Sequence, residues 1–180
     1  MTKSDFRATK SLAADLMRIE ESIIKNESQV VSSVSQIKNM IPSLENLSIN
    51  AIEFRDTVSG INSTLKDKFD VLEDDMTSLD GMDLFEFKTS PDDVIINLRK
   101  ASDNVTNLDY RIEDCVKLIV KSKGNKQFQD EINSATEEVQ KLLKTLDDLS
   151  IEISSSLKML MGEIKHFKAH SKDLLQHKIL

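Results

Sequence analysis

The most restrictive feature of the sequence is an apolar residue at every seventh position from Leu16 to Leu79. The ten positions are Leu16, Ile23, Val30, Ile37, Leu44, Ala51, Val58, Leu65, Leu72 and Leu79. Since 39% of the chain is apolar, a random run of ten would arise roughly once in 10,000 trials. A second apolar series accompanies it, interrupted by polar residues at Asn26, Ser33 and Lys68. Two such series, which together form a seam, predict long helices packed as a coiled coil or bundle.

The scarcity of turn-forming residues agrees with this prediction. The 180 residues include only four glycines and two prolines. Strand-rich and doubly wound folds need many such residues at their turns, so these fold classes are disfavoured. Four scattered glycines also provide no glycine-rich loop for binding a phosphate. The composition therefore favours an all-α protein.

Pro42 lies within the first long periodic segment. Proline removes a helical hydrogen bond and crowds the preceding turn, so the helix must kink or break there. The seven-residue spacing continues across it, from Ile37 through Leu44 to Ala51. Because a loop would release this phase, we favour one kinked helix over residues 5–79. The alternative is a chain that folds back at Pro42.

The remaining sequence predicts a loop over residues 80–90 and two further helices over 91–122 and 126–177. Ser90 and Pro91 form a typical helix start, and Gly124 lies just beyond the expected end of the middle helix. In the last helix the spacing changes between Ile153 and Leu157, which predicts a stutter. We therefore expect residues 1–180 to form a single all-α domain. Its expected architecture is a long-helix coiled coil or elongated antiparallel bundle of three long helices, the first kinked or broken at Pro42.

The length of the first helix has a consequence for partners. If it is continuous, the two shorter helices cannot cover its N-terminal half, and another chain must cover the apolar stripe. The partner-binding residues would then be Leu16, Ile23, Val30, Ile37 and Leu44. If the chain instead folds back at Pro42, four helices form an up-down bundle that needs no obligatory partner.

The expected loop over residues 80–90 carries four large apolar side chains in acidic surroundings. They are Met82, Leu84, Phe85 and Phe87. They can plug one end of the bundle, or they can serve as a short protein-docking motif that fits a basic groove.

No convincing reaction centre is visible in the sequence. Glu163, His166 and His170 lie one helical turn apart, but the second half of a di-iron signature is missing. Cys115 occupies a seam position, where a cysteine behaves as a small buried apolar residue. We assign no catalytic, cofactor-binding or metal-binding residues.

Charge and targeting signals narrow the class of partner and the location. The net charge of −7 disfavours nucleic-acid binding. No stretch is apolar enough to span a membrane, and the apolar helix faces resemble bundle seam more than interfacial anchors, so membrane-surface binding is disfavoured. The N-terminal residues do not resemble a signal peptide, and a single cysteine fits a reducing compartment. We expect a cytoplasmic or nuclear protein.

These observations predict a non-enzymatic coiled-coil subunit or scaffold that assembles with itself or with partner helices in a multiprotein complex. The architecture is similar to that of long-helix subunits in cytoskeletal, kinetochore, vesicle-tethering and viral assembly complexes. The alternative is a self-contained helical bundle that binds a small ligand, metal or lipid.

Overall fold

The computed structural model describes residues 3–40, 51–82, 87–122 and 125–179, with helix backbone alone at 3–10 and 171–179. The described residues form four α-helices and one short 3₁₀ helix, with no strand among them. The α-helices are α1 (Lys3–Met40), α2 (Ala51–Asp80), α3 (Pro91–Ser122) and α4 (Gln129–Ile179), and the 3₁₀ helix η2 (Lys126–Phe128) leads into α4. The described part of the chain therefore belongs to the all-α class, as the sequence predicts.

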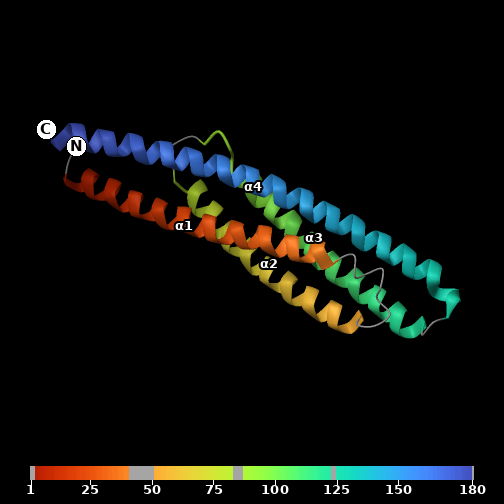
Figure 1. Ribbon diagram of the computed structural model, residues 1–180. Coiled ribbons are helices and arrows are strands. Elements are labelled where there is room, and N and C mark those ends of the chain that lie inside the picture. Colours follow the sequence, from red (N-terminus) through yellow and green to blue (C-terminus); the bar gives the residue numbers. More distant parts are fainter. Residues whose placement is uncertain (1–2, 41–50, 83–86, 123–124, 180) are drawn as a thin grey trace.

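The favoured continuous first helix is wrong. α1 ends at Met40 and a separate helix, α2, begins at Ala51 and packs back along α1 (Figure 1). Pro42 itself lies outside the described residues. The seven-residue phase continues through this region because both helices bury their seams in the same core, which requires no continuous helix between them.

Contacts between the helices establish an antiparallel bundle. Along α1 and α4, Glu20 binds Lys168 and Lys38 binds Asp147, so the two helices run in opposite directions. Along α2 and α3, Asn62 contacts Asp109 and Glu73 binds Arg99. α3 and α4 show the same relation, since Asn97 contacts Glu152 and Arg111 binds Glu138. Each helix thus neighbours the next, and α4 closes the bundle against α1 (Figure 1).

The predicted seam forms the interior of this bundle. Leu16, Ile23, Val58, Leu65, Leu72 and Leu79 have no exposed surface, and Val30 and Ile37 are almost completely buried. The polar seam residues Asn26 and Ser33 are also buried. On α3, the buried residues Val94, Leu98, Ala101, Val105, Leu108, Ile112 and Cys115 follow the predicted spacing.

The predicted stutter of the last helix lies elsewhere. From Val139 to Ile164 the buried positions alternate regularly by four and three residues: Val139, Leu143, Leu146, Ser150, Ile153, Leu157, Leu160 and Ile164. The alternating three- and four-residue spacing of the sequence up to Ile153 predicts Leu142 and Leu149 as seam residues, but both are only partly buried. The interior positions that the sequence pattern missed are Leu143 and Ser150, of which Ser150 is polar. The irregular step falls instead at Val139, which lies four residues after Ala135 and four residues before Leu143.

The four helices differ in length, so two of them extend past the others. At 1.5 Å per residue, α1, α2, α3 and α4 are about 57, 45, 48 and 76 Å long. The beginning of α1 and the end of α4 project together at one end of the elongated bundle, where both chain termini lie (Figure 1). None of the described helices has the length and apolar character that crossing a bilayer would require.

We predict that burial within one chain, without a partner, carries most of the stability. Leu72→Ala, at a fully buried position of α2, should lower the free energy of unfolding by about 2–5 kcal/mol because it opens a cavity. Val71→Ala, one residue away and 38% exposed, is the matched control and should change it by less than about 1 kcal/mol. Urea denaturation measures both. Equal effects of the two substitutions would contradict the assigned register of α2.

Candidate interaction surface

The seam residues expected to bind a partner lie inside the protein's own bundle. Leu16, Ile23, Val30 and Ile37 are at most 2% exposed, and they join the core shared by all four helices. Leu44 lies outside the described residues. The expectation that another chain covers this stripe rested on a continuous first helix. Because α2 and α4 of the same chain cover α1, these side chains offer no surface to a partner.

The described residues at the two ends of the loop between α2 and α3 contact the bundle. Met82 and Phe87 are partly buried and contact the hydrophobic core, which agrees with the plug interpretation for these two residues. Leu84 and Phe85 lie outside the described residues. The backbone N–H of Lys88 donates to Glu163 Oε1 at 2.6 Å, and that of Thr89 donates to Glu163 Oε2 at 3.4 Å. Glu163 of α4 thereby binds the end of the loop just before α3 begins, a role that no motif in the sequence indicates.

A polar contact joins α1 to α2 beside the core. Ser22 Oγ donates to Asp75 Oδ2 at 2.7 Å, and the buried Asn26 amide donates to the Ser22 carbonyl oxygen at 2.7 Å. Burial raises the pKa of the Asp75 carboxyl, and the hydrogen bond from Ser22 opposes this shift. The contact therefore specifies how α1 and α2 are aligned. Its cost is the partial burial of the Asp75 carboxylate.

A second polar contact joins α2 to α3. Asn62 is completely buried, and its Nδ2 donates to Asp109 Oδ1. Asn62 Oδ1 is buried without a hydrogen-bond partner among the described residues. Burial raises the pKa of the Asp109 carboxyl, against the lowering effect of the Asn62 hydrogen bond. The second apolar series of the sequence continues at Ile61, but Ile61 is only partly buried and the structure buries the next residue, Asn62. The available sequence signal is that Asn62 lies four residues after Val58 and three before Leu65.

Residues with metal or nucleophilic chemistry do not converge in the described part of the chain. His166 and His170 are exposed on α4, whereas Glu163 contacts the loop. The side chain of His177 lies outside the described residues. No group of three possible metal ligands occurs among the side chains that the structure describes. Cys115 is buried, and this burial raises the pKa of its thiol, which disfavours the reactive thiolate.

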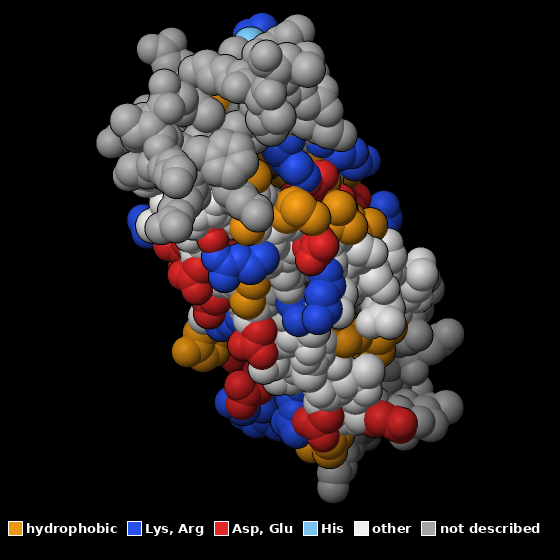
Figure 2. All heavy atoms as spheres, turned by 90° about the vertical axis from the view of Figure 1, so that its left-hand side faces the viewer, with side chains coloured by type: hydrophobic (Ala, Val, Ile, Leu, Met, Phe, Trp, Pro, Cys, Tyr) orange, Lys and Arg blue, Asp and Glu red, His pale blue; other side chains and the backbone are white. Residues whose placement is uncertain are grey.

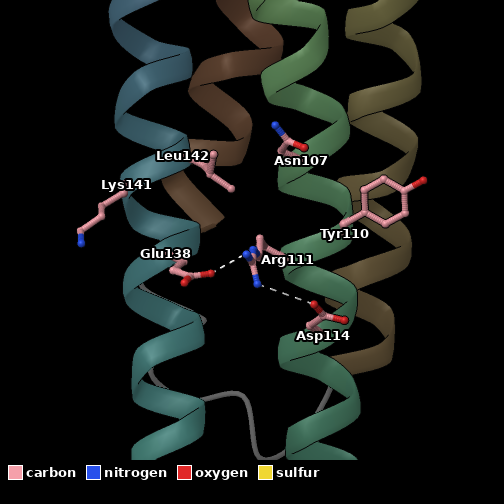
Figure 3. A pocket seen from close by; sticks show the side chains of 7 residues that line it. All are labelled: Asn107, Tyr110, Arg111, Asp114, Glu138, Lys141 and Leu142. Atoms are coloured by element: carbon pink, nitrogen blue, oxygen red, sulfur yellow. Dashed lines mark ion pairs between the residues drawn. The ribbon is translucent and has the colours of Figure 1, made fainter.

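A surface pocket lies between α3 and α4 (Figure 3). It is lined by Asn107, Tyr110, Arg111, Asp114, Glu138, Lys141 and Leu142. Arg111 Nε binds Glu138 Oε2 at 2.9 Å and its Nη1 lies 3.9 Å from Asp114 Oδ2, so these charged groups already satisfy one another. Tyr110 and Lys141 point away from the pocket on opposite sides (Figure 3). The arrangement stabilises the contact of α3 with α4 and leaves few polar groups for a ligand.

The outer surface of α1 carries a row of exposed apolar residues. Met17, Ile24 and Val31 are 51%, 50% and 42% exposed, and they repeat at intervals of seven. Each follows a seam residue directly, which produces the apolar pairs Leu16–Met17, Ile23–Ile24 and Val30–Val31. These repeated pairs are the sequence signal for the row, although the two seam series by themselves do not include it. Hydrophobic side chains also reach the surface between charged ones in the view along the bundle (Figure 2).

Comparisons with known proteins supply no assignment. No family model matches the chain, and neither the curated proteins nor the solved structures contain a match.

We predict that Glu163 holds the loop in place. Glu163→Ala should speed hydrogen exchange of the Lys88 and Thr89 amides by about tenfold, since hydrogen bonds to a charged group contribute about 1.5–3 kcal/mol. Glu152→Ala, on the same helix, is the control and should leave these amides unchanged. Exchange monitored by NMR distinguishes the two variants, and unchanged protection in Glu163→Ala would contradict this role.

We predict that Asp109→Asn stabilises the protein near neutral pH. The folded-state pKa of Asp109 lies above its ordinary value of 3.8, so the folded state binds this proton more tightly than the unfolded state does. The contribution of Asp109 to the free energy of unfolding therefore rises as the pH falls through the raised pKa towards 3.8. It is lowest when the carboxylate is charged. An asparagine amide also supplies a donor for Asn62 Oδ1.

The check on this prediction is urea denaturation between pH 4 and pH 8, with Asp103→Asn, an exposed position of α3, as the control. The gain in Asp109→Asn should shrink as the pH falls, whereas Asp103→Asn should show no such trend. A destabilised Asp109→Asn at pH 7 would show that the carboxylate is needed in its charged form.

Proposed function

We propose that the protein is a non-enzymatic helical scaffold or structural subunit that binds helices of other proteins within a multiprotein complex. The row formed by Met17, Ile24 and Val31 is the observation that carries this proposal. The bundle interior is already filled by the protein's own seam, so these exposed side chains are not needed to complete it. Regularly spaced aliphatic residues on the outside of a helix are typical of helix–helix association.

The proposal relocates the binding surface that the sequence suggested. The original partner-binding seam of α1 is buried, and the adjacent row one position further along the helix is exposed. The buried seam and the exposed row both repeat every seven residues. Partner helices would therefore pack on the outside of a completed bundle, and the chain can fold before it meets them.

The proposed function is tested by crosslinking the full chain at its native expression level and measuring the mass of the recovered species. We expect a species heavier than one chain, and we expect Ile24→Glu to reduce its yield at least tenfold. A buried carboxylate without a partner would oppose the packing of a second helix. Ile96→Glu, at a 44% exposed isoleucine of α3, is the matched control and should preserve the yield.

Recovery of the wild-type chain only as a monomer would contradict the scaffold role. Circular dichroism of both variants should show unchanged helix content, because both positions are exposed.

A further inference from the structure

The apolar row of α1 lies beside α4. Residues three apart are neighbours on a helix surface. Met17 precedes Glu20 by three positions and Ile24 precedes Glu27 by three, while Glu20 binds Lys168 at 2.7 Å and Glu27 accepts a 2.7 Å hydrogen bond from Ser154 of α4. Since Glu20 and Glu27 border α4, the apolar row flanks the line of contact between these two helices.

On the other side of this line α4 carries Lys144, Lys158 and Lys165, with Ile151, which is 62% exposed, between the first two at the same seven-residue spacing. Lys168 and Asp147 of α4 both contact α1. Lys165 lies three positions before Lys168, and Lys144 lies three positions before Asp147. Lys158 lies seven positions from Lys165 on the same side of the helix. Lys144, Lys158 and Lys165 are exposed and form no ion pair with a described residue. We call Met17, Ile24, Val31, Lys144, Lys158 and Lys165 together the α1–α4 face.

The charges of the α1–α4 face and its border are unbalanced. Glu20 is neutralised by Lys168, and Asp147 is neutralised by Lys38. Glu27 is partly buried and hydrogen-bonded to Ser154. Two exposed carboxylates border the face: Glu21 lies four positions after Met17, and Asp148 lies four positions after Lys144. Lys158 and Lys165 have no acidic residue three or four positions away on α4, so their positive charge stands beside the apolar row, on a protein whose net charge is −7. An occupant that complements this face must bring negative charge to α4 and apolar groups to α1.

The spacing of the face identifies the shape of its occupant. Met17 to Val31 spans 14 residues, or about 21 Å of helix. A row that repeats every seven residues matches the apolar row of another helix, and an adjacent row of acidic residues would then face the lysines. We propose that the α1–α4 face binds an acidic amphipathic helix of a partner protein. This inference rests on the proposed scaffold function and specifies its binding surface and the charge of its partner.

Two other occupants fit the face less well. A second copy that placed the same face against this one would set the lysines either against lysines or against the apolar row. Neither arrangement supplies a row of acidic residues, which disfavours a symmetric dimer. A membrane surface would meet three aliphatic side chains of α1 and Ile151 of α4, whereas interfacial helices use broader apolar faces with bulky anchors. Both occupants are outcomes that the experiment distinguishes.

The test uses the purified full chain and two synthetic 21-residue helical peptides. Both carry leucine at heptad positions a and d, one with glutamate and the other with lysine at positions b and e. Calorimetry should show binding of the glutamate peptide at least tenfold tighter than that of the lysine peptide. Raising the salt from about 0.05 to 0.5 M should reduce this preference, because exposed charges are screened.

Two variants locate the binding. Ile24→Glu should weaken binding of the glutamate peptide at least tenfold. The double variant Lys158→Glu with Lys165→Glu should reverse the preference in favour of the lysine peptide, a gain that a misfolded protein would not produce. The matched controls on the diagonal helix α3, Ile96→Glu and the double variant Lys100→Glu with Lys121→Glu, should bind as the wild type does.

Failure of the glutamate peptide to bind, or equal binding of both peptides, would overturn the inference. Equal losses of binding in the α3 controls would also overturn it. So would self-association that Ile24→Glu abolishes, or tighter binding to phosphatidylserine vesicles that the same variants abolish. If the peptides fail while Ile24→Glu still removes the crosslinked species, the scaffold function stands and the acidic-helix inference is wrong. If the crosslinked species is absent as well, both are wrong.

Discussion

Every other feature of this protein depends on the burial of the α1 seam by two helices of the same chain. α2 covers one flank of α1 and α4 covers the other, so Leu16, Ile23, Val30 and Ile37 are removed from water without a second molecule. The hydrophobic effect stabilises the folded state in proportion to the apolar area that is removed from water, whichever chain covers that area. Once the seam is covered internally, binding can take place only on the outer surface.

Polar side chains at the contacts between helices determine how the helices are aligned along their axes. A purely apolar seam allows neighbouring helices to slide by a heptad at modest cost, whereas a buried polar group must find its partner. Asn62 with Asp109, and Ser22 with Asp75, meet such partners at one relative position of the helices. The raised pKa of each aspartate shows that this alignment opposes full solvation of the carboxylates.

The remaining apolar residues fall into two groups, one packed against the core and the other exposed on the outer face. Met82 and Phe87 contact the core, and Glu163 accepts hydrogen bonds from the loop backbone. Met17, Ile24 and Val31 instead remain half exposed beside the lysines of α4. The same residue types thus serve different purposes because the neighbouring helix either covers them or leaves them open.

The sequence alone determined that the chain is helical, where α3 begins and ends, and which residues of α1 turn away from water. These are local properties, since the spacing of apolar residues, Pro91 and Gly124 act within a few turns of helix. Tertiary structure decided that α1 ends at Met40, that Asn62 and Ser150 enter the core, and that Glu163 holds the loop. A heptad pattern is identical whether the covering helix belongs to the same chain or another. Only the three-dimensional packing therefore decides that helices of the same chain cover the row beginning at Leu16.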